Sequence, residues 1–167
     1  ADPQASLSQS LGIVEEQDRN LFTELKKEMA GETSALAEVV ITSASGLKLV
    51  PASIELAGAE LELVSVYGRE QVFTWMLESV KADYDFILID CPPAIGMLTV
   101  NALVASDYVL MPLQAEFLPL KGLRSFMHHY KVIRGKLNRK LEVIGFVLTR
   151  YDERKTMNRQ VLKELED

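Results

Sequence analysis

Asp90 is the residue of this sequence that is the strongest candidate for a chemical role. It ends the apolar run FILID (86–90) and is followed by Cys91, two prolines and a glycine-bearing loop. An apolar strand that ends in aspartate is how phosphoryl-transfer enzymes hold a carboxylate near Mg²⁺. Aspartate at such a position also caps turns and helices, so both a metal-binding and a structural interpretation are open.

Basic residues gather toward the end of the chain, where they could contact a polyanion. The whole chain has a formal net charge of -6, yet residues 121–163 contain twelve basic and three acidic residues. A polyanion meets the local potential rather than the net charge, so this region could bind phosphates. Lys121 and Arg124 share one side of a predicted helix, which a solvated face explains equally well. A second group follows in the sequence: Arg150, Arg154, Lys155 and Arg159.

Apolar runs of strand length predict the sheet that would position these side chains. They cover residues 86–90, 108–113 and 142–149, and each is apolar on both faces. Strands of a parallel sheet that is covered by helices have this composition. A weaker run covers residues 47–52 and is stopped by Pro51.

Helical patterns alternate with these runs. Residues 120–137 carry apolar side chains at a 3.6-residue period, and further helices are predicted over 21–29, 68–84 and 156–166. This alternation predicts an α/β fold with a mostly parallel sheet flanked by helices. Ligands of such sheets collect at the carboxyl ends of the strands, which is where Asp90 lies. No internal repeat or linker is visible, so we expect one domain.

The composition excludes several classes of protein. No apolar run approaches the roughly 20 residues that a membrane-spanning helix needs, and no basic segment followed by an apolar one begins the chain. The single cysteine, Cys91, excludes an internal disulfide and fits a reducing compartment. Without a histidine partner nearby in sequence it is interpreted as a buried small residue. We therefore expect a cytoplasmic protein with no membrane partner.

Five segments occur in the order typical of one known family. They are DPQASLSQSLGI (2–13), VPASIELAGAELEL (50–63), YDFILIDCPPAIGMLTVNAL (84–103), VLMPLQAEFLPLKGL (109–123) and GFVLTRYDERK (145–155). Together they resemble the ParA/Soj family of chromosome- and plasmid-partitioning ATPases, relatives of MinD with a deviant P-loop. The resemblance covers essentially the whole chain and implies a P-loop NTPase-like, Rossmann-like α/β fold.

The resemblance implies roles for particular residues. Asp2 matches the family's switch aspartate, which positions the attacking water, and Asp90 matches the aspartate that holds Mg²⁺ through a water. Arg154 falls where family members place an arginine for non-specific DNA binding. The remaining candidates are Gln4, Gln114 and Glu116 near the nucleotide and dimer interface, and Arg150, Lys155, Lys121 and Arg124 beside the DNA.

The resemblance also implies cofactors and partners. ATP and Mg²⁺ would be bound, a homodimer would form on ATP, and the dimer would bind DNA without regard to sequence. A ParB-like activator would stimulate hydrolysis, and the protein would associate with the nucleoid.

The sequence departs from the family pattern in small and large ways. Ala5 and Ser6 replace the usual Gly and Asn after Asp-Pro-Gln, and Ala94 replaces the usual Ser. No G-x-x-x-x-G-K-[ST] occurs in residues 1–167. The family places this P-loop before Asp-Pro-Gln and continues past the position of Asp167. We therefore expect 1–167 to be one ParA-like domain, incomplete at both ends and inactive by itself. A MinD-like or other cargo-positioning ATPase, or a non-catalytic docking fragment, are the alternatives.

Overall fold

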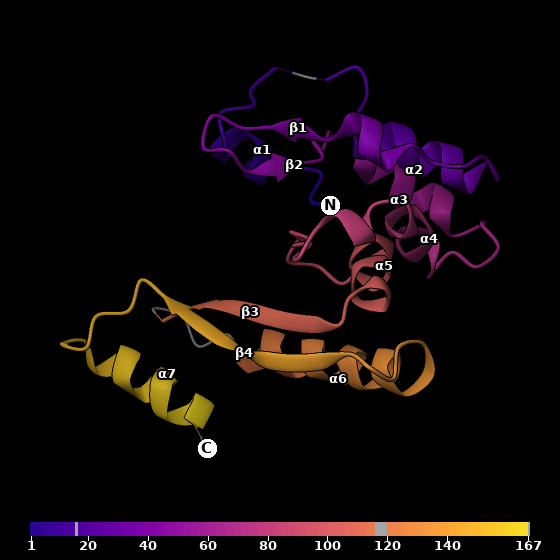
Figure 1. The fold of residues 1–167 in the computed structure, drawn as a ribbon. Helices are drawn as coiled ribbons and strands as arrows, with labels where there is room; N and C mark the ends of the chain where they lie inside the picture. Colours follow the sequence, from indigo (N-terminus) through magenta and orange to yellow (C-terminus); the bar gives the residue numbers. More distant parts are fainter. Residues whose placement is uncertain (16, 116–119, 167) are drawn as a thin grey trace. The chain divides into compact units, whose positions relative to one another are not determined.

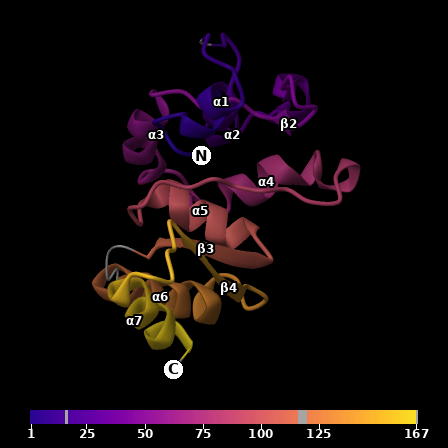
Figure 2. The same ribbon diagram turned by 90° about the vertical axis from the view of Figure 1, so that its left-hand side faces the viewer.

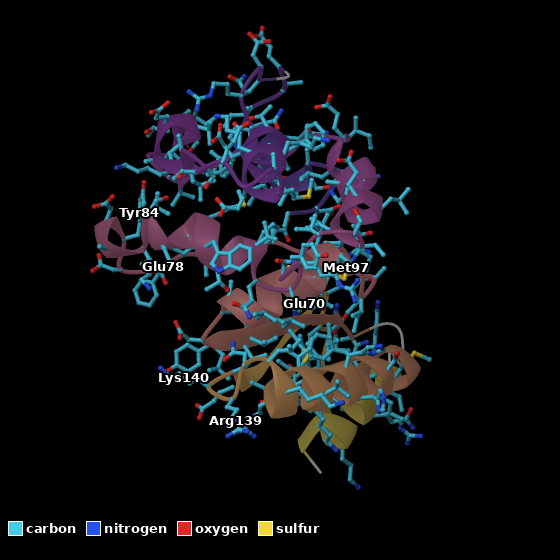
Figure 3. All side chains as sticks on the ribbon, turned by 90° about the vertical axis from the view of Figure 1, so that its right-hand side faces the viewer. Glu70, Glu78, Tyr84, Met97, Arg139 and Lys140 are labelled. Carbon is cyan, nitrogen blue, oxygen red and sulfur yellow. The ribbon has the colours of Figure 1, made fainter. Side chains whose placement is uncertain are left out.

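The computed structural model describes residues 1–15, 17–115 and 120–166. These fall into two compact units, Ala1–Ala105 and Ser106–Asp167, each of which is described by itself (Figures 1 and 2). The boundary between the units also divides the charge. The first unit contains sixteen acidic and six basic residues, whereas the second contains eight acidic and twelve basic residues. Figure 3 labels two acidic members of the first unit, Glu70 and Glu78, and two basic members of the second, Arg139 and Lys140.

The first unit is largely helical. Its elements in chain order are α1 (Ser6–Ser10), α2 (Leu21–Met29), the 3₁₀ turn η1 (Leu36–Val39), β1 (Ile41–Thr42), β2 (Lys48–Leu49), α3 (Leu56–Leu63), α4 (Val72–Glu78), the 3₁₀ turn η2 (Lys81–Asp83) and α5 (Met97–Ala105). The strands β1 and β2 pair antiparallel as a short hairpin. The helices α2 to α5 pack around a common core, whose fully buried members are Leu25, Leu56, Ala59, Leu63, Val72 and Leu98.

Helix α2 begins where the sequence places its start signal. The side-chain oxygen of Asn20 accepts hydrogen bonds from the backbone of Phe22 (2.9 Å) and Thr23 (3.2 Å). Thr23 Oγ1 accepts one in return from the Asn20 N–H at 3.0 Å, which completes a capping box. Gly31, with φ of 80°, follows the last turn. The prediction of a helix over 21–29 is confirmed.

A buried asparagine holds two other helices of this unit together. Asn101, on α5, is fully buried. Its Oδ1 accepts the N–H of Phe73 at 3.2 Å, and its Nδ2 donates to the carbonyls of Arg69 (2.7 Å) and Met97 (2.9 Å). A polar side chain inside an apolar core is tolerated when its donors and acceptor are satisfied in this way.

The second unit contains a parallel strand pair. Its elements are β3 (Tyr108–Gln114), α6 (Leu120–Lys136), β4 (Glu142–Thr149) and α7 (Thr156–Glu166). The register runs from Tyr108 opposite Glu142 to Gln114 opposite Thr149. A register shift after Val109 coincides with Gly145, whose φ of 150° favours glycine. In both ribbon views α6 and α7 lie on the same side of this pair (Figures 1 and 2). The predicted α/β fold with parallel strands is confirmed.

The expectation of a strand over residues 86–90 is wrong for the described structure. These residues lie outside every assigned strand, and the side chains of Phe86 and Leu88 are 86% and 89% exposed. A strand needs a neighbouring backbone to satisfy its amides, and none of the described residues supplies one here. The weaker run at 47–52 yields only β2, which is antiparallel, and the predicted helix over 68–84 is divided into α4 and η2.

The sheet of the second unit is also less covered than predicted. Met111 of β3 is buried, but Leu110 and Ile144 remain more than half exposed. The buried residues Tyr130 and Ile133 lie on the predicted apolar stripe of α6. Across the part of the chain that the structure describes, no helix combines the length and apolarity that crossing a membrane requires.

Candidate functional site

The loop at residues 2–5 is built by its own backbone and by Asp2. The Asp2 carboxylate accepts the N–H of Gln4 at 3.0 Å, and its carbonyl accepts the N–H of Ala5 at 3.0 Å. This Asx turn orients the carboxylate before α1 begins. Ala5 has φ of 52° and ψ of 26°, in the left-handed region that favours glycine. This geometry gives a physical reason for the glycine that is usual at this position in the family that the sequence resembles.

One backbone hydrogen bond brings two distant candidates to the same place. The nitrogen of Ala1 donates to the carbonyl oxygen of Asp90 at 2.8 Å. Asp2 and Asp90 consequently line one small cavity of about 20 Å³, together with Ser6 and Ala52. The two residues that the sequence analysis assigned to water and to metal are thus neighbours, although 88 positions separate them in the sequence.

Cys91 lies beside these two carboxylates and is not suited to nucleophilic chemistry. Its side chain is half-buried against the core, and its Sγ–H points to the carbonyl of Ile89 at 3.5 Å. Burial raises the pKa of the thiol, and this effect, with that of the Asp90 and Asp2 carboxylates, outweighs the lowering by the positive charge at the Ala1 nitrogen. A protonated thiol is a poor nucleophile, which agrees with the interpretation of Cys91 as a small buried residue.

Gln4 faces a different and larger cavity. This cavity has a volume of about 340 Å³ and lies between residues 3–15 with Gln17 on one side and residues 51–54 on the other. The N–H of Leu21 donates to the carbonyl of Pro51 at 2.8 Å, so the start of α2 holds one wall. Ala5 and Ser8 border both cavities. Gln4 therefore lies next to Asp2 but does not line the small cavity that Asp2 and Asp90 share.

A carboxylate from α3 takes over the capping of α5, just after the Asp90 loop. Gly96 occupies the position before the first residue of α5 and has no side chain with which to cap it. Glu60 Oε1 instead accepts the N–H of Leu98 at 3.1 Å. A Cβ added to Gly96 would lie 2.0 Å from that oxygen. Sequence reasoning missed this contact, although both residues belong to segments that it quoted.

The remaining interface candidates lie in the second unit. Gln114 is the last residue of β3 and is exposed. Beyond it, the Ala115 N–H donates to the Thr149 carbonyl at 3.0 Å, so the two strand ends stay paired. Glu116 falls outside the described residues.

The basic candidates cluster around the end of β4 and along α6. Arg150 follows β4 with φ of 54° and is exposed. Arg154 is 87% exposed at its side chain and forms an ion pair with Asp152, and Lys155 is exposed next to it. Arg124 is exposed on α6. Lys121 lies on the first turn of α6, and its side chain is outside the described part of the structure.

Asn158 organises this basic loop and was not a candidate from the sequence. It is fully buried, and its Oδ1 accepts the N–H of Asp152 at 2.7 Å. Its Nδ2 donates to the carbonyl of Ala115 at 2.7 Å. An asparagine in the first turn of a predicted amphipathic helix is common, so residue type alone carries no signal for this role.

The donor set near Asp90 suits a hard cation held by few protein ligands. The described residues contain no group of three or more His, Cys, Asp or Glu side chains arranged to hold a metal ion. Mg²⁺ in phosphoryl-transfer proteins takes one or two carboxylates and completes its shell with water and phosphate oxygens. The Asp90 carboxylate fits such a site, with Asp2 beside it in the same small cavity.

Comparisons with known proteins point to one family. The AAA domain family matches residues 1–143. The chromosome partitioning protein ParA of Caulobacter vibrioides is 41% identical over 167 residues, which cover 99% of this chain and 61% of that protein. The sporulation initiation inhibitor protein Soj of Bacillus subtilis is 37% identical over 164 residues, covering 98% and 64%. The chain thus spans about three-fifths of the length of the curated relatives it matches.

Solved structures agree on the fold. Cobyrinic acid a,c-diamide synthase from Mycobacterium smegmatis, with bound ADP and magnesium, superposes with a TM-score of 0.87 at 34% identity, covering 99% of this chain and 66% of that one. A plasmid partition protein from Borrelia burgdorferi superposes with a TM-score of 0.80 at 22% identity, covering 99% and 69%.

Proposed function

This chain belongs to the AAA domain family and is similar over nearly its whole length to ParA and Soj partitioning proteins, and on this premise we propose that it acts in a ParA-type ATPase. In that protein ATP binding and hydrolysis switch dimerisation and non-specific DNA binding, which moves DNA or another cargo. The 167 residues would supply the switch loop, the metal carboxylate and the DNA-binding surface.

The hydrogen bond from Ala1 to the Asp90 carbonyl is the observation that carries this proposal. It brings together a carboxylate that could orient water and one that could hold a metal. Phosphoryl transfer is achieved mainly by positioning and electrostatic stabilisation, and its recurring parts include a residue that orients the nucleophile and a carboxylate that holds the metal ion.

The chain's own residues divide the chemistry between them. Asp90 would hold Mg²⁺ through a water, and the ion would supply positive charge to neutralise the phosphates when ATP is bound. Asp2 would accept a hydrogen bond from the attacking water, while the Gln4 N–H holds its Oδ1 in place. Gln4, Gln114 and Glu116 would lie at the nucleotide and dimer interface.

DNA would be held by the basic residues of the second unit. Guanidinium groups bind phosphate oxygens in a bidentate manner, and such binding ignores base sequence and weakens steeply with salt. The excess of basic over acidic residues in this unit supports that role. The proposed phosphate contacts are Arg154, Lys155, Arg150, Lys121 and Arg124.

The names of the relatives support the proposed partners. One relative is named a chromosome partitioning protein. In such a role this protein would work with a ParB-like activator, form a homodimer on ATP and associate with the nucleoid in the cytoplasm. A MinD-like or other cargo-positioning ATPase is the alternative. Capture of DNA rather than of lipid vesicles by the protein would favour partitioning.

A segment exchange tests the catalytic roles. The matching segment of Caulobacter vibrioides ParA is replaced by these 167 residues, and ATP hydrolysis is measured with DNA and activator present. We expect the exchanged protein to hydrolyse ATP and Asp2→Asn to remove that activity. Asp18→Asn, at an exposed position outside both cavities, is the matched control and should leave it intact. Equal activity of the two variants would refute the role of Asp2.

The 167-residue polypeptide itself gives a complementary test. No lysine-bearing P-loop sequence occurs in it, so the phosphates would have no cradle of backbone N–H groups. We propose that it neither binds ATP tightly nor hydrolyses it. Saturable binding of Mg²⁺ and ATP in isothermal titration calorimetry would contradict this.

A further inference from the structure

Arg154 does not present a free guanidinium fork to solvent. Its Nε donates to Asp152 Oδ1 and its Nη2 to Asp152 Oδ2, both at 2.9 Å. The backbone N–H of Arg154 also donates to Oδ1 at 3.0 Å. This is the two-point arrangement with which arginine recognises a phosphate, so the carboxylate occupies two of the donors that a phosphate would use.

The two partners of this ion pair are held very differently. Asp152 is tied down by its backbone, because its N–H donates to the buried Oδ1 of Asn158 at 2.7 Å. Asn158 is fixed in turn by its bond to the carbonyl of Ala115, at the end of β3. The Arg154 side chain is 87% exposed, whereas that of Asp152 is 29% exposed. When the pair opens, the guanidinium is therefore the group that moves.

We infer that Asp152 is an internal competitor for phosphate at Arg154: the anchored carboxylate holds the guanidinium fork until a DNA phosphate displaces it. The inference rests on the proposed function, in which Arg154 contacts DNA. Asp152 lowers the affinity that the basic residues alone would give. Asn158 is the positioning residue that keeps the competing carboxylate in reach.

The guanidinium of the neighbouring Arg159 donates to acceptors other than a carboxylate. Its Nη1 donates to the Glu153 carbonyl at 2.9 Å and its Nη2 to Thr156 Oγ1 at 3.2 Å. The pKa of Asp152 is lowered, first by the hydrogen bond from the Arg154 side chain and then by that from its backbone. The carboxylate is thus ionised at neutral pH and available as a competitor.

The test compares two neighbouring carboxylates. Asp152→Asn removes the charge but keeps an oxygen for the Arg154 N–H, so the turn is retained, and circular dichroism verifies the fold. Glu153→Gln is the matched control, because it removes one negative charge from the adjacent exposed residue. Binding of a short fluorescein-labelled DNA duplex of mixed sequence is measured with the exchanged Caulobacter vibrioides ParA that carries these 167 residues, in the presence of ATP and Mg²⁺. It is followed by anisotropy over a series of salt concentrations.

We expect Asp152→Asn to tighten DNA binding by roughly two- to fivefold at low salt, which is the range of an exposed ion pair. Glu153→Gln should have a smaller effect, and Arg154→Ala should abolish the gain from Asp152→Asn. In ¹⁵N NMR spectra the Arg154 Nε–H resonance should shift in Asp152→Asn and again on addition of DNA. A purely structural role of Asp152 would not move binding in this direction.

Each other outcome has a distinct meaning. Binding that is unchanged or weaker in Asp152→Asn, while Arg154→Ala weakens binding, overturns the competition but leaves the proposed function standing. DNA binding that is the same in wild type and Arg154→Ala, or absent from wild type and Asp152→Asn even at low salt, overturns the proposed role of Arg154 itself.

Discussion

The contact between Gly96 and Glu60 predicts that one substitution, Gly96→Ala, lowers the stability of the wild type but raises the stability of a Glu60 variant. Gly96→Ala would put a Cβ 2.0 Å from Glu60 Oε1, whereas real Cβ contacts stay beyond 3.0 Å. The flexible carboxylate must therefore withdraw, and its hydrogen bond to the Leu98 N–H, now 3.1 Å, is lost. Helix α5 then loses the cap that Glu60 provides in place of a side chain at Gly96.

The magnitude follows from two opposing terms. Loss of a capping bond at a helix N-terminus costs about 1–2 kcal/mol. Replacement of glycine by alanine where the backbone permits it stabilises by about 0.4–1 kcal/mol through the unfolded state, and Gly96 has no positive φ. In the wild-type background Gly96→Ala should thus destabilise, by up to about 1.6 kcal/mol. In Glu60→Ala, where the cap is already absent, the same change should stabilise by about 0.4–1 kcal/mol.

Equilibrium unfolding in urea measures this cycle. Trp75 is the single tryptophan and lies on α4, which packs against α5, so its fluorescence reports on this unit. Gly58→Ala is the matched control, because its Cβ would meet nothing within 4 Å. It should stabilise equally in both backgrounds. Equal effects of Gly96→Ala with and without Glu60 would refute the argument.

Two further predictions concern titrating groups. Glu24 is fully buried, which favours its neutral form, but hydrogen bonds from Lys27, the Ala35 N–H and Arg19 outweigh burial and lower its pKa. The ionised Glu24 therefore stabilises the fold at pH values above the carboxyl pKa of the unfolded chain, about 4.3. This stabilisation is lost as pH falls through the lower pKa that Glu24 has in the folded chain. Glu24→Gln should cost about 1–3 kcal/mol at neutral pH, and urea unfolding should show that this difference shrinks in acid. Burial raises the pKa of Cys91, so its alkylation by iodoacetamide near neutral pH should be slower than that of free cysteine, and a faster rate would contradict the geometry.

Local elements of this fold could be predicted from residue patterns. The helix at 21–29 has a capping asparagine and a terminal glycine, and the structure places α2 at Leu21–Met29. The apolar stripe of α6 and the parallel pairing of β3 with β4 also agree with the sequence. These features depend on side-chain periodicity and on residues close in the chain, which a sequence displays directly.

The failure at residues 86–90 has a different origin. The run FILID has the composition of a buried strand, but composition does not provide a partner. Pairing depends on which other backbone segment lies alongside, and in the described structure Phe86 and Leu88 remain exposed. Asp90 was nominated partly as the end of that strand. It remains a candidate because the family resemblance also points to it and because it lines one cavity with Asp2.

Residue types and order were enough to identify the family and to nominate Asp2, Asp90 and Arg154. The tertiary structure alone brought Asp2 beside Asp90, Glu60 to the start of α5 and Asn158 between Ala115 and Asp152. Each of these contacts joins side chains or backbone groups that face each other only after distant segments have packed. Glu60 and Asn158 satisfy backbone groups that folding removes from water. That requirement arises in the folded chain and not in any single stretch of the sequence.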